Sequence, residues 1–305
     1  MKYKIISLIR SISPLYLRQK VGPIFAYFSY VKRIYLQKSN NIKVLSIDET
    51  IDIVKNEKLS VIRFGDGEMS LIEGSDLAFQ NHNENLADKL KIILQSNNDK
   101  LLICVPGIFG KLNNFTKRAY WFSLHHVFRY GYVWKKNIEI KNIYGDAFIT
   151  RPYLTFKDKS NCTNIFNKLF LIWRNERVVL IEGEKSRLGV GNNMFDEVSS
   201  LERILCPAEN AFDKYLEIKK EVLKINKNKL ILISLGPTAK ILAYDLFLLG
   251  YRVIDIGHVD MEYEMFLRNE NKIVKVDYKY FNEISERNPE ECQDDKYISQ
   301  IIAKI

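Results

Sequence analysis

The stretch KLILISLGPTAKILAYDLFLLGYRVIDI, residues 229–256, carries the pattern that decides the fold. It begins as an apolar strand over 229–235, turns at Gly236-Pro237-Thr238, and continues as an apolar helix over 239–249. After Gly250 a second strand follows over 251–256. Apolar strands that are joined through a helix are typical of a parallel sheet covered on both faces. We therefore predict an α/β, Rossmann-like fold with a mostly parallel sheet and helices on both faces.

The same alternation extends through most of the chain. Further strands are predicted at 59–64, 100–105 and 177–181, and helices at 47–55, 86–94, 118–134 and 212–223. Ser46 is the predicted N-cap of the helix at 47–55. The last residues, 270–305, end in apolar positions at helical spacing, and we expect them to form a terminal excursion without a part in the chemistry.

Composition predicts one large domain with extensions. A chain of 305 residues with 47% apolar content can bury a sizeable core, and its seven prolines leave little room for a linker. We divide it into an N-terminal extension at 1–44, a main domain at 45–270 and a C-terminal tail at 271–305 that packs on the domain. The four cysteines form no CxxC pair, which favours a reducing cytoplasm.

The net charge of +9 is concentrated at the N-terminus. Residues 1–38 contain no acid and carry eight cations, namely Lys2, Lys4, Arg10, Arg18, Lys20, Lys32, Arg33 and Lys38. Cations mixed with apolar residues are typical of a segment on an anionic membrane surface, here the inner face of the cell membrane. The alternative is a helical extension that packs on the domain or on a second subunit. No recognisable nucleic-acid motif accompanies the charge, and no nucleic-acid partner is expected.

Five of the predicted strands end in short turns that contain glycine. Ligands bind at the carboxyl ends of the strands in an open parallel sheet, so these turns are expected to face one crevice. The turns are Gly65-Asp66-Gly67-Glu68, Pro106-Gly107, the stretch 182–192, Gly236-Pro237-Thr238 and Gly257-His258-Val259-Asp260.

Asp66 and Glu68 are the predicted metal ligands. Alternate residues of an extended backbone point the same way, and the glycine between them permits a tight turn. Carboxylate oxygens suit Mg²⁺ or Mn²⁺, which commonly bridge to a substrate diphosphate. The alternative is an acidic turn before a helix, in which Glu68 only complements the helix dipole.

Two other turns can hold phosphate groups. The loop at 185–192 offers cations and close backbone approach through Lys185, Arg187, Gly189, Gly191 and Asn192. Gly236, Pro237 and Thr238 open a helix, whose N–H groups attract an anion. The alternatives are a solvated surface loop for the first and, for the second, a proline that simply suits a helix start.

His258 differs from the other histidines in its position at a strand end, beside Asp260. It could orient a phosphate, complete a metal shell or act as a base, and the sequence leaves the three roles open. The aromatic stretch that contains Tyr120, Trp121, Phe122 and Tyr130 could form a wall for a sugar acceptor, or it could be core.

Several separated motifs in this order resemble the GT-D type of glycosyltransferase, formerly a domain of unknown function, which is found in bacterial glycan and glycoprotein assembly. The resemblance covers about residues 45–268 and leaves the first 44 residues outside. The matching stretches are Arg63-Phe64-Gly65-Asp66-Gly67-Glu68, Phe79-Gln80, Gly189-Val190-Gly191-Asn192 with Phe195, Cys206-Pro207 with Asn210-Ala211-Phe212, Gly236-Pro237-Thr238-Ala239, and Gly250-Tyr251 with 255–264.

The resemblance implies a Rossmann-like domain, a DxE metal motif at Asp66 and Glu68, Mn²⁺ or Mg²⁺, and a UDP-sugar donor, often UDP-glucose. We expect a hexosyltransferase that moves the sugar to a glycan acceptor, lipid-linked if the N-terminus lies on a membrane, as in capsule or other surface polysaccharide assembly. The expected catalytic residues are Asp66, Glu68, His258 and Asp260. The expected substrate-binding residues are Arg63, Gly65, Gly67, Lys185, Arg187, Gly189, Gly191, Asn192, Gly236, Pro237 and Thr238.

Two other function classes remain open at this point. A metal-dependent hydrolase of a nucleotide or sugar phosphate would use the same crevice, and a non-catalytic nucleotide-binding module would bind without turnover. An NAD-dependent dehydrogenase is disfavoured, because no GxGxxG motif follows a strand with an acidic residue at the expected distance.

Overall fold

The computed structural model describes residues 27–28, 31, 42–139, 142–283 and 289–305. The predicted N-terminal extension lies almost entirely outside this part of the chain, so the membrane-surface segment at residues 1–38 stays a prediction. None of the described helices combines the length and the apolar character that crossing a bilayer requires.

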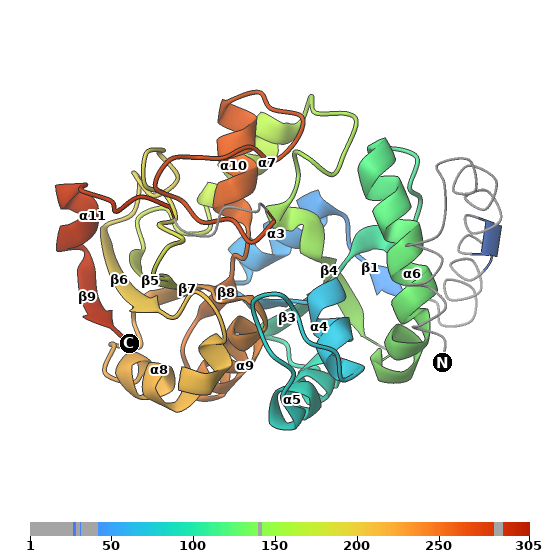
Figure 1. Cartoon of the computed structure of the whole chain (residues 1–305), viewed down its shortest axis with the longest axis horizontal. Coiled ribbons are helices and arrows are strands. Elements are labelled where there is room, and N and C mark those ends of the chain that lie inside the picture. Colours follow the sequence, from blue (N-terminus) through green and yellow to red (C-terminus); the bar gives the residue numbers. More distant parts are fainter. Residues whose placement is uncertain (1–26, 29–30, 32–41, 140–141, 284–288) are drawn as a thin grey trace.

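A nine-stranded sheet runs through the middle of the molecule in the order β1-β4-β3-β2-β8-β7-β5-β6-β9 (Figure 1). Every strand pair in it is parallel, which confirms the predicted fold class. The strands are β1 Lys43–Val44, β2 Ser60–Arg63, β3 Leu101–Val105, β4 Ile143–Asp146, β5 Arg177–Gly183, β6 Ser200–Cys206, β7 Leu230–Ser234, β8 Val253–Asp255 and β9 Ile301–Lys304.

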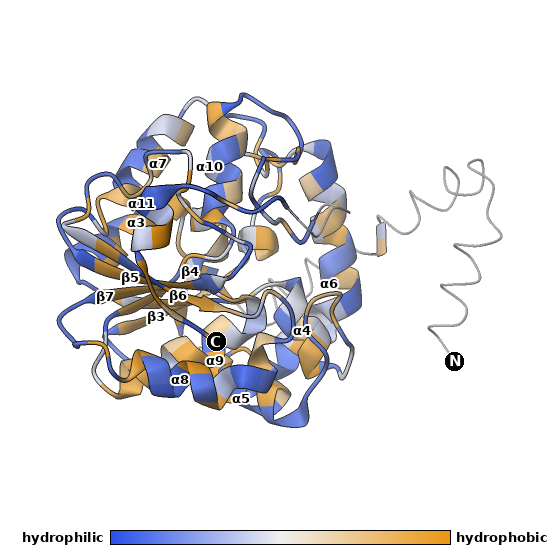
Figure 2. Cartoon of the chain, turned by 60° about the vertical axis from the view of Figure 1, so that its left-hand side comes forward, coloured by the Kyte–Doolittle hydropathy of each residue, from blue (hydrophilic) through white to orange (hydrophobic). Residues whose placement is uncertain are grey.

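Helices cover both faces of the sheet, which Figure 2 shows nearly edge-on. An apolar core on one face includes side chains of α4, α5, α6, α8 and α9. A second core on the other face includes those of α3, α7 and α10. The helices are α3 Ile47–Asn56, α4 Asp66–Ile72, α5 Glu84–Gln95, α6 Lys117–Asn137, α7 Cys162–Phe170, α8 Tyr215–Val222, α9 Gly236–Leu248, α10 Val259–Leu267 and α11 Asp295–Ser299, with 3-10 turns at η1 Gly107–Phe109, η2 Ala147–Thr150 and η3 Ala211–Lys214.

The predicted helix at 47–55 illustrates why local signals worked. Ser46 caps α3 as predicted, because its Oγ accepts a hydrogen bond from Glu49 N at 3.2 Å while Ser46 N donates to Glu49 Oε2 at 2.8 Å. This reciprocal pair satisfies two N–H groups that a helix start otherwise leaves open. Similar agreement holds for the five predicted strands, each of which is present within a few residues.

The prediction for the last residues was wrong in its details. Of the tail residues that the structure describes, only 295–299 form an α-helix, and Ile301–Lys304 instead form β9, which pairs in parallel with β6 at the edge of the sheet. The strands β1, β4 and β6 were also missed, since they are very short or carry charged residues such as Glu202 and Arg203. Partners that are distant in sequence stabilise these strands, and a local pattern does not contain that information.

The strand order reverses between β2 and β8. From β2 the chain moves outward through β3 and β4, whereas β7, β5 and β6 lie on the far side of β8. In an open parallel sheet this reversal creates a crevice beyond the carboxyl ends of the two adjacent strands. The fold therefore places the end of β2, at Arg63, beside the end of β8, at Asp255.

Candidate active site

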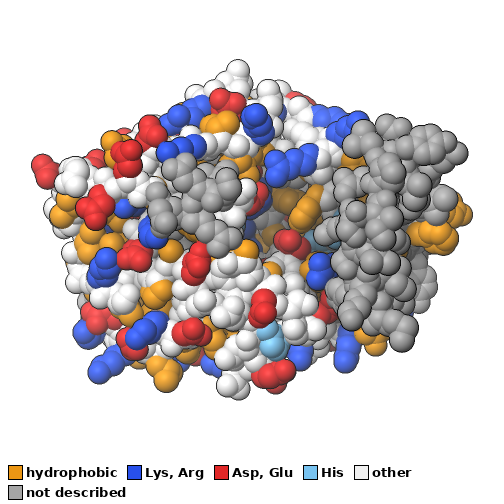
Figure 3. Space-filling view, in the orientation of Figure 1, with side chains coloured by type: hydrophobic (Ala, Val, Ile, Leu, Met, Phe, Trp, Pro, Cys, Tyr) orange, Lys and Arg blue, Asp and Glu red, His pale blue; other side chains and the backbone are white. Residues whose placement is uncertain are grey.

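A cleft of about 700 Å³ lies at the carboxyl ends of the strands. Figure 3 shows a hollow in the middle of this face, with hydrophobic side chains at its bottom and charged side chains around it. The volume lies within the range of small-molecule sites. Residues at or just beyond the ends of β2 to β8 line the cleft, namely Arg63, Pro106, Ala147, Gly183, Pro207, Ser234 and Gly257. The five predicted glycine turns thus contribute to one crevice.

Buried ion pairs hold the two central strands together below the cleft. Arg63 Nη2 lies 3.1 Å from Asp255 Oδ1, and Arg63 Nε donates to Asp255 O at 2.9 Å. Lys240 Nζ, from α9, lies 3.0 Å from Asp255 Oδ2. Burial alone would raise the pKa of Asp255, but the two cations outweigh it and lower this pKa. Arg63, predicted to bind substrate, therefore lines the cleft mainly as a partner of Asp255.

Glu68 is also held by protein partners. Its Oε2 accepts a hydrogen bond from Gly65 N at 2.7 Å, and its Oε1 lies 3.2 Å from Lys240 Nζ. Gly65 is the N-cap of α4, so Glu68, as residue N3, satisfies the N-cap N–H, which is one half of a capping box; Gly65 has no side chain for the reciprocal bond. The carboxylate is buried, and Lys240 connects it to Asp255.

Asp66 behaves differently, although it belongs to the same turn. Its side chain is exposed at the cleft and makes no side-chain ion pair or hydrogen bond among the described residues beyond the N–H groups of its own helix start. Surrounding protein still removes enough water to raise the pKa of Asp66, an effect that those N–H groups and the Arg151 charge oppose. Asp66 is therefore a carboxylate that lacks a directly paired cation.

Asp66 suits a hard divalent cation that takes most of its shell from a ligand and water. Among the described residues no group of three or more His, Cys, Asp or Glu side chains could hold a metal by itself. Mg²⁺ is typically bound through one or two carboxylates plus substrate phosphates and water. Asp66 offers an open carboxylate for such an ion, whereas Glu68 would have to share its oxygens with Lys240 and Gly65.

Arg151 extends this charged group on the side of the C-terminal tail. It forms an ion pair with Glu283, and its charge also acts on Asp66 and on Glu262. Glu262 Oε2 accepts hydrogen bonds from Tyr153 N at 3.0 Å and Leu154 N at 2.9 Å. Its Oε1 is buried without a hydrogen-bond partner, and burial raises the pKa of Glu262 despite the opposing effect of Arg151.

His258 lies at the start of α10 and lines the cleft. Its Nε2 lies 2.9 Å from Asn282 Oδ1, so the ring nitrogen that faces this acceptor carries the proton. Desolvation lowers the pKa of His258 to about 4, and the neighbouring Arg151 charge acts in the same direction. The imidazole is therefore neutral at pH 7 and leaves Nδ1 as an acceptor.

Asp260 also lines the cleft, but its carboxylate is occupied. Lys279 Nζ lies 2.9 Å from Asp260 Oδ1 and 2.8 Å from Oδ2, and Gly189 N donates to Oδ1 at 2.8 Å. Asn192 Nδ2 donates to the same oxygen at 2.8 Å. In this structure Asp260 fixes the loop at 189–192 against the tail.

The rest of the predicted phosphate loop turns away from the cleft. Lys185, Arg187, Gly189, Gly191 and Asn192 are absent from the residues that line it. Arg187 is buried and its Nη1 donates to Tyr278 O and Glu290 O, so this side chain anchors the tail. The loop's contribution to the cleft comes instead from Ser186 and Leu188.

The third predicted turn opens α9 at the cleft. Gly236 and Pro237 line it, and Gly236 has φ +51°, a left-handed conformation that favours glycine. A Cβ at Gly236 would lie 2.9 Å from Phe79 Cε2. Thr238 is buried below this surface, where its Oγ1 approaches Gln80 Oε1 at 3.4 Å. Gly65 and Gly67 also line the cleft, at the start of α4.

The aromatic stretch divides between core and cleft. Tyr130 is buried in the core, whereas Phe122 and His126 of α6 line the cleft. His126 Nε2 accepts a hydrogen bond from Trp134 Nε1 at 2.7 Å. Part of this stretch is therefore core, and a role of its cleft-lining side chains as an acceptor wall stays a prediction.

Sequence reasoning missed the charged cleft residues Lys240, Arg151 and Glu283, and the ion pairs of Asp255 below the cleft. Lys240 was accessible in principle, because a lysine one turn after Gly236-Pro237 interrupts an otherwise apolar helix. Arg151 and Glu283 lie outside the long helices and strands, and no motif marks them. The tail was expected to take no part in the site, yet Asn282 and Glu283 line the cleft.

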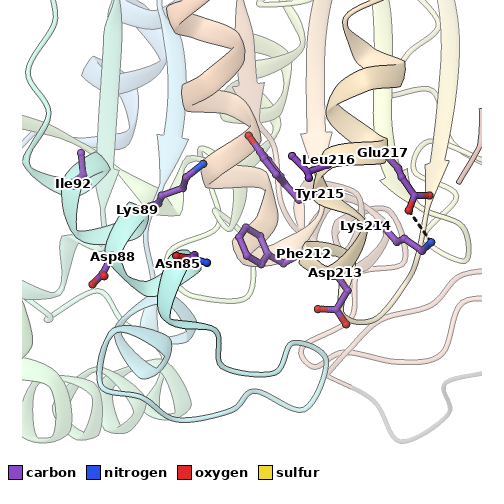
Figure 4. Close-up of a pocket in the computed structure, with 10 residues that line it drawn as sticks. All are labelled: Asn85, Asp88, Lys89, Ile92, Phe212, Asp213, Lys214, Tyr215, Leu216 and Glu217. Carbon is purple, nitrogen blue, oxygen red and sulfur yellow. Dashed lines mark hydrogen bonds and ion pairs between the residues drawn. The ribbon is translucent and has the colours of Figure 1, made fainter.

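A second hollow, of about 550 Å³, lies between α5 and the η3–α8 segment (Figure 4). Phe212 and Tyr215 form its aromatic part, with ring centroids 5.6 Å apart, and Lys214 pairs with Glu217 at 2.9 Å. None of the predicted site residues lines it. The predicted chemistry therefore belongs to the central cleft.

Comparison with known proteins places these features in a family. A family model described as the glycosyltransferase GT-D fold matches residues 61–284. Glycosyltransferase GlyD of Streptococcus pneumoniae serotype 4 is 38% identical over 266 residues, which are 87% of this chain and 33% of that protein. The probable glycosyl transferase Gly of Streptococcus gordonii is 38% identical over 276 residues, 88% of this chain and 39% of that protein. The chain thus spans between a third and two fifths of the length of these curated relatives.

Solved structures show the same likeness. A structure of domain of unknown function 1792, described as having a distinct glycosyltransferase fold, has a TM-score of 0.85 and 38% identity, covering 90% of this chain and 99% of that one. A structure from Streptococcus sanguinis, described as a new glycosyltransferase, has a TM-score of 0.83 and 38% identity, with coverage of 87% and 99%. These matches confirm the resemblance, and the chain belongs to the GT-D fold family of glycosyltransferases.

Proposed function

We propose that the chain transfers a sugar from a UDP-sugar to a glycan acceptor, with Mn²⁺ or Mg²⁺ bound at Asp66. The observation that carries the proposal is the Asp66 carboxylate, which is exposed in the cleft. It lies beyond the end of β2, where the strand order of the parallel sheet reverses between β2 and β8. In this family context, a carboxylate without a directly paired cation is suited to a metal that arrives with the diphosphate of the donor.

The surroundings of Asp66 suit a diphosphate. The N-termini of α9 and α10 begin at the cleft, and such helix ends attract phosphate through their N–H groups. Arg151 stands within range of Asp66 and is partly exposed. We infer that Arg151 turns from Glu283 toward the phosphates when the donor binds, because a guanidinium binds phosphate oxygens in a bidentate manner.

The apolar part of the cleft suits the uracil and sugar rings. Phe64, Phe79, Phe122, Phe148 and Phe281 line it, and aromatic faces pack against planar bases and against sugar rings. The diphosphate would bind at the Asp66 end of the cleft, and its position would set where the uracil ring and the sugar ring lie.

The groups at the cleft would act in two ways: some would stabilise the charge on the leaving UDP, and others would orient the substrate. A divalent cation at Asp66 would supply positive charge against the charge that develops on the leaving UDP. The helix N-termini and Arg151 would add to that stabilisation without reorganising water. His258 is a weak base at neutral pH because its pKa is about 4, so its Nδ1 is better suited to accept a hydrogen bond from a substrate hydroxyl.

Thermal unfolding with UDP-, GDP- and dTDP-sugars, with and without Mn²⁺, tests the proposal. A UDP-sugar at about 100 times its Kd should raise the Tm by about 5 °C, and only with the metal present. Asp66→Asn should lose this metal-dependent shift. Asp213→Asn, at the second hollow, is the matched control and should retain it.

Product analysis then separates transfer from hydrolysis. A glycan acceptor should receive the sugar in the wild type, and Asp66→Asn should lower the rate by a factor of about one hundred or more, the range seen when one charge-stabilising group is removed. No stabilisation by any UDP-sugar, or an Asp66→Asn variant as active as wild type, would refute the proposal. Release of free sugar at the same rate with and without acceptor would indicate a hydrolase instead.

A further inference from the structure

Helix α6 has an unusual composition for a surface helix. Its sequence, KRAYWFSLHHVFRYGYVWKKN, contains five Lys and Arg residues and no Asp or Glu. The surface helices α8, with YLEIKKEV, and α5, with ENLADKLKIILQ, mix both signs, and α7, with CTNIFNKLF, has a single lysine and no acid. Mixed charge keeps an ordinary surface in water, so the one-sided composition of α6 requires a physical reason.

The exposed side chains of α6 are almost all basic or aromatic. The outer face, as we define it, consists of Lys117, Trp121, Phe128, Tyr132 and Lys136. These residues lie along one stripe of the helix at the spacing of about 3.6 residues per turn. Their aromatic members are exposed by 39% for Trp121, 37% for Phe128 and 69% for Tyr132. The opposite face, with Leu124, Val127 and Trp134 among others, packs into the core.

This combination fits the surface of a membrane. Trp and Tyr are enriched at the level of lipid headgroups, because each has an apolar ring and a polar tip. Helices that lie on a bilayer have Lys and Arg along a face whose apolar side chains enter the boundary. Each cation near anionic lipids adds to the attraction between the helix and the bilayer.

We propose that the outer face of α6 docks on an anionic lipid bilayer. The helix lies at one end of the described part of the chain, near β1 and β4 (Figure 1). A second copy of the chain is a poorer occupant, since a two-fold dimer through this face would place the cations of one helix near those of the other.

Docking through α6 would also place the central cleft near an acceptor that is carried by a lipid. The same helix lines the central cleft through Arg118, Phe122 and His126. A docked α6 would therefore hold one wall of the cleft close to the bilayer, where a saccharide on a lipid carrier is presented. This consequence rests on the proposed function, whereas the docking itself does not.

Binding of the full chain to vesicles tests the docking. The probes are phosphatidylcholine vesicles with and without phosphatidylglycerol, and the readout is co-sedimentation. One variant, Trp121→Ser with Tyr132→Ser, removes aromatic contacts; another, Lys117→Gln with Lys136→Gln, removes charge. None of the four residues lines the cleft. Each pair should weaken binding to the anionic vesicles by about tenfold.

The matched control lies at the other end of the molecule, on α8. Leu216→Ser with Lys220→Gln removes one exposed apolar side chain and one exposed cation there, and binding should stay unchanged. Equal binding by wild type and both α6 variants would overturn the proposal, as would an equal loss in the control. A loss of RNA binding or of a dimer in the α6 variants, with vesicle binding intact, would also overturn it.

The UDP-sugar shift in Tm, measured without vesicles, keeps the two proposals apart. It should be the same in wild type and in the α6 variants. If vesicle binding depends on α6 but no UDP-sugar binds, the docking stands and the consequence for a lipid-linked acceptor falls with the proposed function.

Discussion

Lys240 is the residue on which the charged centre below the cleft depends. It is 6% exposed, and its Nζ lies 3.2 Å from Glu68 Oε1 and 3.0 Å from Asp255 Oδ2. It also donates to Gly236 O at 3.1 Å. A buried ammonium is tolerated only when such partners replace water. Lys240 thereby joins the start of α4, the end of β8 and the start of α9.

Replacing Lys240 by methionine should be strongly destabilising. The variant keeps much of the side-chain volume but leaves two buried carboxylates with one partner fewer. Breaking a buried pair in this way typically costs about 3–5 kcal/mol, and the remaining Asp255–Arg63 pair should keep the loss near the lower end. The free energy of unfolding, measured in urea, checks this expectation.

Lys229→Met is the control for that measurement. Lys229 pairs with Glu202 at 2.7 Å, but both side chains are partly exposed. Solvent screens such pairs, so the control should lose only about 1 kcal/mol or less. Equal losses in the two variants would contradict the role given to Lys240.

Asp66 and Glu68 show how two residues of one motif can differ. Glu68 is fixed by Gly65 N and Lys240, whereas Asp66 has no such partners. The acidic-turn interpretation of the sequence thus describes Glu68, whereas the metal-ligand role of Asp66 stays a proposal. Glu68 caps the helix, and Asp66 is the carboxylate that remains available to a cation.

At the scale of elements, α9 connects the core to the cleft. Its middle is buried among the apolar side chains of one face, and its first residues line the site. Glycines flank it at both ends, with φ +51° at Gly236 and φ +87° at Gly250. Only the first is crowded, because nothing lies within 4 Å of a Cβ at Gly250.

This difference predicts unequal effects of alanine. Gly250→Ala should cost about 1 kcal/mol through backbone strain alone. Gly236→Ala should cost more, since its Cβ would displace Phe79, and it should also weaken UDP-sugar binding. Urea unfolding and the UDP-sugar Tm shift give the two readouts. Undiminished UDP-sugar binding by Gly236→Ala would argue against the start of α9 as part of the site.

The C-terminal tail, residues 271–305, also contributes to the cleft, which was not expected from the sequence. Arg203 of β6 forms a buried ion pair with Glu182, and its guanidinium lies 5.0 Å from the ring centroid of Tyr297. Arg187 anchors Tyr278 and Glu290 by their carbonyl oxygens. These contacts bring the preceding residues of the tail, among them Asn282 and Glu283, back across the cleft.

For the whole molecule, buried titratable groups act on stability in opposite directions. Desolvation lowers the pKa of His126 to about 3 and that of His258 to about 4. Desolvation raises the pKa of Asp146 to about 7. Between about pH 6.5 and 4 the unfolded chain binds more protons at the histidines, so they reduce stability as the pH falls. At Asp146 the folded chain binds more protons between about pH 7 and 4, so this residue increases stability as the pH falls.

The histidine part of this balance can be isolated. From pH 7 to 5 the wild type should lose about 2 kcal/mol relative to His126→Gln, which cannot be protonated but keeps an acceptor for Trp134 Nε1. Asp146→Asn should change in the opposite sense, because it lacks the gain that the wild type makes on acidification. Urea unfolding at the two pH values measures both. A stability difference between wild type and His126→Gln that is the same at both pH values would contradict the buried, neutral histidine.

The sequence by itself determined the fold class of this protein and the edge of the sheet at which its site lies. Apolar strands that end in glycine turns predicted the parallel sheet and the crevice at its carboxyl edge, because period, caps and turns are local properties of the chain. The separated motifs indicated the family, and Asp66 and Glu68 stood out within them as a pair. The five predicted strands and the capped helix at Ser46 follow from the same local physics.

Only the tertiary structure decided which side chains meet. Arg63 and Asp255 are 192 positions apart, and Arg151 and Glu283 are 132 apart, yet both pairs lie at the cleft. It also turned Arg187 and Asn192 away from the cleft and brought the tail into it. The physical reason is that a charge leaves water only where distant partners replace it, and those partners are fixed by how strands and helices pack rather than by neighbours in sequence.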